Sequence, residues 1–216
     1  MKKLFTVLLV LVSTTLISAQ SFKIGVGGGL TTFTAPESLT KDISEGGFGV
    51  SVGYHFGAKA RFSLPVIPLA FFCEINYSPL KGEEDVDYNN LYGHNIKMHY
   101  ETESSLLSIG IGAQYSIIPG PISPYASAEV IYNSLADMKV KYSGTSGSTI
   151  VKEEMTVSEK FNRTGVGLGA GVFISVLPLI DIDVNVKYKI VNVAGKEDGE
   201  DTMSLVNVNA TVFFGL

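Results

Sequence analysis

The segment that decides the fold reads Leu107-Ser108-Ile109-Gly110-Ile111-Gly112-Ala113-Gln114-Tyr115-Ser116-Ile117. Every second residue is apolar, and each residue between them is small or polar. Successive side chains of a β-strand point to opposite faces of the sheet. The segment therefore predicts a strand with one apolar face and one polar face.

The same alternation recurs about eight times along the chain. It is cleanest near the C-terminal end, where Val206, Val208 and Val212 share one face and Asn207 and Asn209 share the other. Charges on one face of the segment before it exclude a strand that is buried on both faces. The alternation predicts strands over 22–34, 47–61, 69–78, 103–116, 123–135, 161–176, 181–193 and 204–216.

The connections between these strands alternate between long and short. Prolines such as Pro65, Pro119 and Pro178 lie in the short ones, where a rigid turn needs no donor for a strand ladder. In an up-and-down barrel alternate connections lie at opposite ends, so the long loops are expected to share one end. The longer connections are 35–46, 79–102, 136–160 and 194–203, and the shorter ones are 62–68, 117–122 and 177–180.

The chain begins like an export signal. Lys2 and Lys3 give a positive start, an apolar run follows to Ile17, and Ala19 offers a small residue for cleavage before Gln20. The apolar run is shorter than the roughly 20 residues that a spanning helix needs. We therefore expect residues 1–19 to be a cleaved signal peptide and residues 20–216 to form one barrel domain.

No later segment has an apolar run long enough for a spanning helix. A mature chain that enters a membrane must then do so as a closed barrel, because lipid leaves no backbone group unpaired. Aromatic residues support that reading, because they are expected in two outward-facing belts at the membrane interfaces. One belt is Phe22, Phe56, Phe71, Tyr115 and Phe214, and the other is Phe48, Tyr77, Tyr132 and Tyr188.

Charge and cysteine content exclude other classes of protein. The chain has 16 basic residues, and removing Lys2 and Lys3 leaves 14 against 21 acidic residues. This acidic balance argues against nucleic acid as a partner. Cys73 is the single cysteine, so no intrachain disulfide forms and no cysteine after the signal could carry a lipid anchor.

These features together resemble the small OmpA/OmpX-type outer-membrane β-barrels. The resemblance covers the mature chain, including a last strand that ends in Val212-Phe213-Phe214-Gly215-Leu216. It implies an all-β, eight-stranded antiparallel up-and-down transmembrane β-barrel in the bacterial outer membrane, a monomer surrounded by lipid. It also implies insertion by the barrel-assembly machinery, which often reads a C-terminal Phe; Leu216 stands in that place here, two residues after Phe214.

An eight-stranded barrel has an interior that side chains can fill. Five cations against four carboxylates on the inward face are near the balance that a low-dielectric interior requires. We expect this network to plug the lumen rather than to form an ion path, and inward Phe72, Tyr125, Phe173 and Phe213 would add to the closure. The predicted network is Lys23, His55, Lys59, Arg61, Glu74, Gln114, Glu129, Asp181, Asp183, Lys187 and Lys189.

Glycines recur on the inward face, as at Gly27 and Gly167. A phosphate-binding loop is the alternative, but no Gly-Lys-Ser/Thr follows and no helix begins there. Space for opposing side chains in a tightly curved wall explains them better. An inward glycine such as Gly112 is therefore expected to accept a serine more readily than an outward position accepts a charge.

The long loops carry acidic runs at 83–87 and 196–201 without the ordered spacing of a calcium loop. His94 and His99 make a poor zinc pair, and no Gly-x-Ser-x-Gly or other catalytic set is present, although Ser104 and Ser105 follow His99 closely. No cofactor, metal or catalytic residue is predicted. We expect a non-catalytic envelope protein, with adhesion, defence or structure as its role and an unidentified loop ligand. The alternatives are a narrow passive porin-like channel, a rim enzyme acting on lipid or peptide, and a secreted lipocalin-like barrel with its apolar face inside.

Overall fold

A computed structural model describes residues 22–91, 94–146, 149–157, 160–177 and 179–215 of the 216-residue chain. The predicted signal peptide lies outside these residues. No helix among the described residues is long and apolar enough to cross a membrane. Nearly all of the described chain is β-strand, joined into a single antiparallel sheet.

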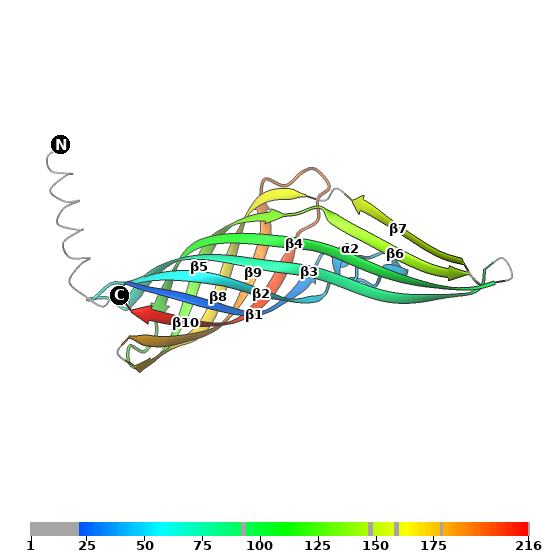
Figure 1. Cartoon of the computed structure of the whole chain (residues 1–216). Helices are drawn as coiled ribbons and strands as arrows, with labels where there is room; N and C mark the ends of the chain where they lie inside the picture. Colours follow the sequence, from blue (N-terminus) through cyan, green and yellow to red (C-terminus); the bar gives the residue numbers. More distant parts are fainter. Residues whose placement is uncertain (1–21, 92–93, 147–148, 158–159, 178, 216) are drawn as a thin grey trace.

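Eight of the strands close into a barrel, as predicted (Figure 1). Closure joins the first strand to the last through β1–β10 pairing, and β3–β4 pairing completes the circle. All neighbouring strands are antiparallel, so the order is up-and-down. The barrel strands are β1 (Phe22–Ala35), β2 (Val52–Ser63), β3 (Leu69–Leu91), β4 (His94–Ser116), β5 (Ile122–Leu135), β8 (Phe161–Leu177), β9 (Ile180–Ala194) and β10 (Ser204–Gly215).

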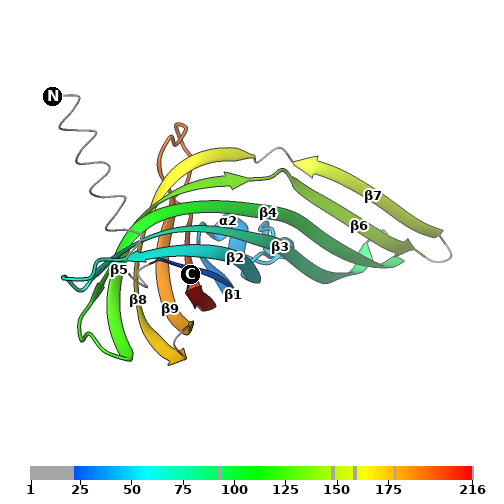
Figure 2. The ribbon, with the colours of Figure 1, turned by 60° about the vertical axis from the view of Figure 1, so that its left-hand side comes forward.

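Two of the predicted long loops are instead sheet. The hairpin β3–β4 continues far past the barrel, and strands β6 (Met138–Ser146) and β7 (Thr149–Val157) extend it by pairing β4 to β6 and β6 to β7. The predictions of loops over 79–102 and 136–160 are therefore wrong. We call this projecting sheet the fin: residues 79–91 of β3, residues 94–105 of β4, β6 and β7 (Figures 1 and 2).

The fin keeps the period of two, and its faces differ in chemistry. Cross-strand register aligns Asp85, His99, Ser143 and Lys152 in one row of the sheet. The face that continues the outer wall of the barrel carries Lys81, Glu83, Asp85, Asp87, Lys97, His99, Glu101, Glu103, Lys139, Lys141, Lys152 and Glu154. The opposite face carries Val86, Met98, Tyr100, Val140, Tyr142 and Met155.

The first long loop folds back onto the open end of the barrel. It forms a short helix α2 (Glu37–Thr40) and a 3-10 turn η1 (Ile43–Glu45), and it buries Leu39 and Val50. Strand β2 accordingly begins at Val52 and not at residue 47. Phe48, predicted to face outward in an aromatic belt, packs against a buried apolar cluster instead, because this loop turns inward there.

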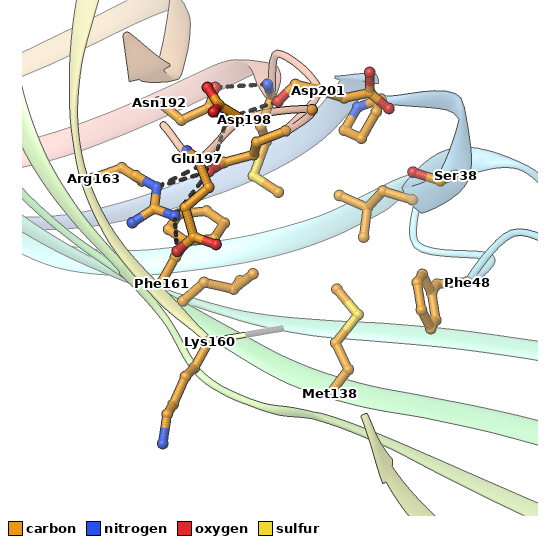
Figure 3. A pocket seen from close by; sticks show the side chains of 16 residues that line it. Ser38, Phe48, Met138, Lys160, Phe161, Arg163, Asn192, Glu197, Asp198 and Asp201 are labelled. Atoms are coloured by element: carbon orange, nitrogen blue, oxygen red, sulfur yellow. Dashed lines mark hydrogen bonds and ion pairs between the residues drawn. The ribbon is translucent and has the colours of Figure 1, made fainter. Parts of the chain in front are cut away.

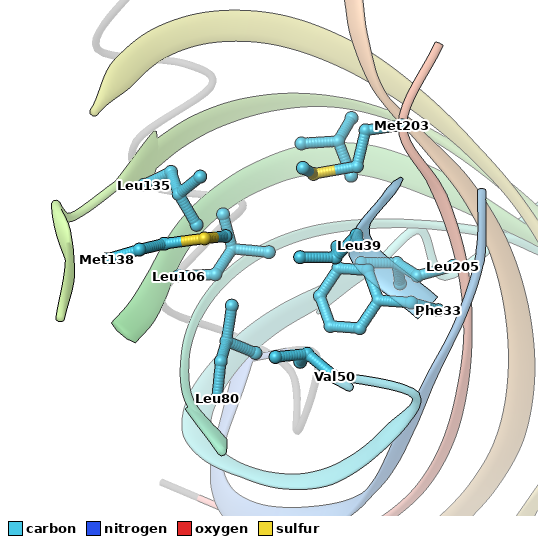
Figure 4. Packing of buried hydrophobic residues seen from close by; sticks show 10 residues of the cluster. Phe33, Leu39, Val50, Leu80, Leu106, Leu135, Met138, Met203 and Leu205 are labelled. Atoms are coloured by element: carbon cyan, nitrogen blue, oxygen red, sulfur yellow. The ribbon is translucent and has the colours of Figure 1, made fainter. Parts of the chain in front are cut away.

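That cluster fills the barrel at the end that carries the fin, and we call it the apolar plug (Figure 4). Its side chains come from the inward positions of the barrel strands, from α2 and from the start of β6. Burial of this apolar surface stabilises the mouth of the barrel. The members are Phe33, Leu39, Val50, Leu80, Leu106, Leu135, Met138, Val191, Met203 and Leu205.

The outer wall is apolar, as the alternation predicts. Ile111 and Leu168 are 63% and 67% exposed, and exposed aliphatic side chains surround the barrel. A continuous exposed apolar band of this kind fits lipid, not water. Exposed Phe56, Tyr115 and Phe214 lie toward one end of the band and exposed Tyr132 and Tyr188 toward the other. A lipocalin-like barrel with an apolar interior is therefore excluded.

Inward glycines lie where neighbouring backbone leaves no room for a side chain. A Cβ built on Gly29 would lie 1.8 Å from the Val208 carbonyl oxygen, and one on Gly112 would lie 2.3 Å from the Ala128 carbonyl oxygen and 2.7 Å from Phe72 Cζ. The expectation that Gly112 accepts a serine is thus wrong, because a strand backbone cannot move aside as a flexible side chain can.

This crowding gives a testable difference between two glycines. We expect Gly29→Ala to lower the free energy of unfolding by about 1–3 kcal/mol, the range for overpacking. Gly53→Ala is the control, since the nearest atom to its Cβ is 3.3 Å away, and its effect should stay within about 1 kcal/mol. Urea titration of the two variants in lipid vesicles measures both, and equal effects would contradict the packing given for Gly29.

Candidate functional site

The centre of the lumen holds a square of four buried charges. Lys187 Nζ lies 2.7 Å from Glu74 Oε2 and 2.9 Å from Glu129 Oε2. Lys189 Nζ lies 3.1 Å from Glu74 Oε1 and 3.3 Å from Glu129 Oε1. Each carboxylate therefore bridges both ammonium groups. Charges this deeply buried persist only when they are paired and hydrogen-bonded.

A second layer lies nearer the short-turn end. Lys59 Nζ lies 2.9 Å from Asp183 Oδ2, and the Tyr125 hydroxyl donates to Asp183 Oδ1 at 2.5 Å. Lys23 forms an ion pair with Asp181. Arg61 donates to Gln114 Oε1 at 3.1 Å through Nε.

Aromatic rings and a histidine complete the filling of the lumen. Lys59 and Lys187 lie 4.6 and 4.7 Å from the ring centroid of Phe72, and the Arg61 guanidinium lies 4.2 Å from that of Phe173. His55 bonds to Thr31 Oγ1 at 2.9 Å and to Asn209 Oδ1 at 3.2 Å. The structure thus places all eleven residues of the predicted network on the inner face and joins them in two stacked layers.

A pocket of about 470 Å³ opens beside the apolar plug at the mouth (Figure 3). Its apolar side includes Phe48, Met138 and Phe161. Its polar side is held by Arg163, whose guanidinium contacts Glu197 Oε1 at 3.1 Å and Glu200 Oε2 at 2.8 Å.

Asn192 ties the 195–203 loop down beside this pocket. Its amide donates to Glu200 Oε1 at 2.7 Å and to the Asp201 carbonyl at 2.8 Å, and its oxygen accepts from the Met203 amide at 2.8 Å. Two carboxylates of the predicted acidic loop are therefore bound to Arg163 rather than left to solvent. Sequence reasoning missed Arg163 and Asn192, although the inward parity of Arg163 was a usable signal.

The mouth loop is expected to open in acid. Burial opposes ionisation of Glu200, but hydrogen bonds from Arg163 and Asn192 outweigh it and lower the pKa to about 2. Since the pKa of an unfolded Glu is about 4.3, the stabilisation is present above that pH and is lost as the pH falls toward 2. The Glu197 amide, which donates to Glu200 Oε2 at 3.0 Å, reports on this closure.

Hydrogen exchange measures the effect. The protection factor of the Glu197 amide should fall between about pH 5 and pH 2. The Phe33 amide, which donates to the Ser51 carbonyl at 2.8 Å, is the control and should keep its protection. Unchanged protection of Glu197 over this range would contradict the role given to Glu200.

The fin holds the remaining candidate residues. His99 Nδ1 lies 2.7 Å from Asp85 Oδ1 and its Nε2 lies 3.3 Å from Glu101 Oε1, and these hydrogen bonds raise the pKa of His99. The Ser104 hydroxyl donates to the Ala136 carbonyl at 2.9 Å. Within the described ranges, no group of three or more His, Cys, Asp or Glu side chains is arranged to hold a metal. The side chain of His94 lies outside the described residues.

An apolar exterior, a filled polar lumen and long extensions at one end define an integral outer-membrane β-barrel protein. The family comparison agrees: residues 4–214 match the outer membrane protein beta-barrel domain, and the chain belongs to that family. The protein accordingly lies in the bacterial outer membrane. No curated protein matches the chain.

The comparison with solved structures agrees with this fold. Neisserial surface protein A is 17% identical with a TM-score of 0.52, and the match covers 92% of this chain and 98% of that one. A major outer membrane protein of Thermus thermophilus is 14% identical with a TM-score of 0.43, covering 90% of this chain and 100% of that one. The attachment invasion locus protein Ail of Yersinia pestis is 14% identical with a TM-score of 0.39, covering 90% and 97%.

Proposed function

We propose that the protein is a non-catalytic surface protein of the outer membrane. In this proposal the barrel is a closed anchor, and the fin and the mouth meet the surroundings of the cell. The protein acts as a monomer in lipid, inserted by the barrel-assembly machinery. The single observation that carries the proposal is the contrast between a lumen filled along its length and a four-stranded sheet that projects from one end.

The filled lumen favours an anchor over a channel. The ion layers around Glu74 and Asp183 cross the barrel below the apolar plug, and both carboxylates are bonded on more than one side. An ion would have to break several buried pairs in succession to pass, and each break leaves an uncompensated charge. A narrow passive channel is therefore the weaker candidate.

The fin is suited to contact with a partner. Its charged face is laced with ion pairs such as Lys141–Glu103 at 2.6 Å and Lys97–Asp87 at 3.6 Å, while Tyr100, Tyr142 and the exposed Met155 lie on the other face. In the described structure, β7 and the outer part of β3 each have a strand partner on one side. Unpaired strand edges that carry charge resist self-association yet can still accept a specific chain.

A shortened fin tests the proposal. Residues 84–100 are replaced by Asn-Gly, which joins the register partners Glu83 and Glu101, and residues 142–153 are replaced likewise, which joins Lys141 and Glu154. Both cuts leave the apolar plug and the lumen intact. We expect the variant to fold with an unchanged lumen, while cells that carry it lose adhesion to plastic and to neighbouring cells as fully as cells without the protein.

Controls separate the alternatives. Surface labelling confirms equal display, and liposome swelling with small sugars measures passive transport. Full adhesion with the shortened fin would contradict the role of the fin, whereas solute entry through the intact protein would favour the channel. Hydrolysis of lipid or peptide by the intact protein would favour the rim enzyme.

A further inference from the structure

The short-turn end of the barrel contains a vestibule that neither the plug nor the fin explains. Its volume is about 370 Å³, and the connection between β2 and β3 forms part of its wall. Short turns mark the periplasmic end of an outer-membrane barrel. The vestibule therefore faces the periplasm, at the opposite end from the mouth pocket.

The polar lining of this vestibule consists of two cations and four hydroxyls. Lys23 and Arg61 are register partners on β1 and β2, so two positive side chains lie directly opposite each other on the inner face. Such like-charge pairs are unfavourable unless something compensates them. The hydroxyls belong to Ser63, Ser116, Ser123 and Ser175, at or near the periplasmic ends of β2, β4, β5 and β8.

The two cations are not equally compensated. Lys23 has its own carboxylate, Asp181. Among the residues that the structure describes, no carboxylate lies within ion-pair distance of Arg61; its printed partners are the neutral Gln114 Oε1 at 3.1 Å and Ser63 Oγ at 2.5 Å. The lumen as a whole repeats this imbalance, because its five cations face four carboxylates. The excess positive charge thus lies at Arg61, beside an open cavity.

The chemistry of this lining matches an oxyanion. A guanidinium presents a planar fork of donors that suits phosphate, and an ammonium adds a point charge. Serine hydroxyls donate to oxygen acceptors and rotate to fit them. We propose that the vestibule binds a tetrahedral oxyanion, as inorganic phosphate or as the phosphate monoester of a lipid headgroup, with Arg61 and Lys23 as its cations and the serines around them.

The sequence makes a direct test possible, because Arg61 and Arg163 are its two arginines. The folded protein in phosphate-free detergent micelles is titrated with sodium phosphate, and the side-chain Nε–H signals of both arginines are followed by NMR. Sodium chloride at the same ionic strength is the reference. We expect a saturable shift of the Arg61 signal and no shift of the Arg163 signal, since Glu197 and Glu200 already occupy that guanidinium.

Variants sharpen the result. Ser116→Ala with Ser123→Ala keeps both cations and should weaken phosphate binding about tenfold, the loss expected for a charge-assisted hydrogen bond. Arg61→Gln should abolish binding. Absence of a saturable shift, an equal shift with chloride, or unchanged affinity in the double serine variant would overturn the proposal.

A second arm distinguishes the source of the oxyanion. The protein is placed in nanodiscs that contain phosphatidic acid, without free phosphate. If the Arg61 signal then lies at its phosphate-bound position, the headgroup is the ligand. If it moves there only after inorganic phosphate is added, the ligand is the free anion.

Discussion

Glu74→Gln is expected to lower the free energy of unfolding by about 3–5 kcal/mol, the cost of breaking a buried ion pair from one side. Glu74 is buried and contacts Lys187 at 2.7 Å and Lys189 at 3.1 Å. The amide leaves these two ammonium groups to share Glu129. Urea-induced unfolding in lipid vesicles, followed by far-UV circular dichroism, measures the change.

Two further variants give this result its meaning. Glu103→Gln removes a carboxylate from the exposed Lys141 pair of the fin and should cost about 0–1 kcal/mol. Adding Lys189→Met to Glu74→Gln removes the unpaired charge and should recover a large part of the loss, because the buried cation causes most of it. An effect of Glu74→Gln no larger than that of Glu103→Gln would contradict a dry, closely coupled lumen.

Ile111→Arg is expected to cost about 2–4 kcal/mol, because it places a charge on the lipid face near the middle of the membrane. Ile111 is 63% exposed on the outer wall and lies near the middle of the part of β4 that pairs with β5. Val184→Arg on β9 should act in the same direction. Equilibrium unfolding from vesicles gives both values.

Tyr115→Arg is the matched control, four residues along the same strand and on the same face. It lies in the aromatic belt near the periplasmic end, where a charge reaches the interface and should cost about 0–1 kcal/mol. Equal losses for Ile111→Arg and Tyr115→Arg would show that depth in a membrane does not matter, and the lipid-facing assignment of the outer wall would fail.

The alternation of apolar and polar residues was sufficient to predict the barrel. It assigned each strand residue to a face, so the eight-stranded closure, the lipid-facing wall and the inward position of Glu74, Asp183 and Lys187 could be read from parity. The pairs themselves, such as Lys187 with Glu74, join residues more than a hundred positions apart. Which cation meets which carboxylate depends on strand register, which the alternation leaves open.

The fin and the plug were missed for physical reasons. The acidic run at 83–87 resembles a solvated loop, yet its side chains alternate between the two faces of β3 and pair across to β4. Leu39 and Val50 lie outside any regular strand pattern, and a distant cluster decides their burial. Likewise, Glu200 meets Arg163 only after the barrel has closed, so no local sequence signal specifies the mouth.

Single-channel recording in planar lipid bilayers tests the central claim most directly, since the account holds that the barrel is a closed anchor. A barrel whose lumen is filled from the Lys23–Asp181 pair to the apolar plug should insert without giving steady conductance steps, and Glu74→Gln should give at most brief openings. Large, steady steps from the unaltered protein would contradict the account.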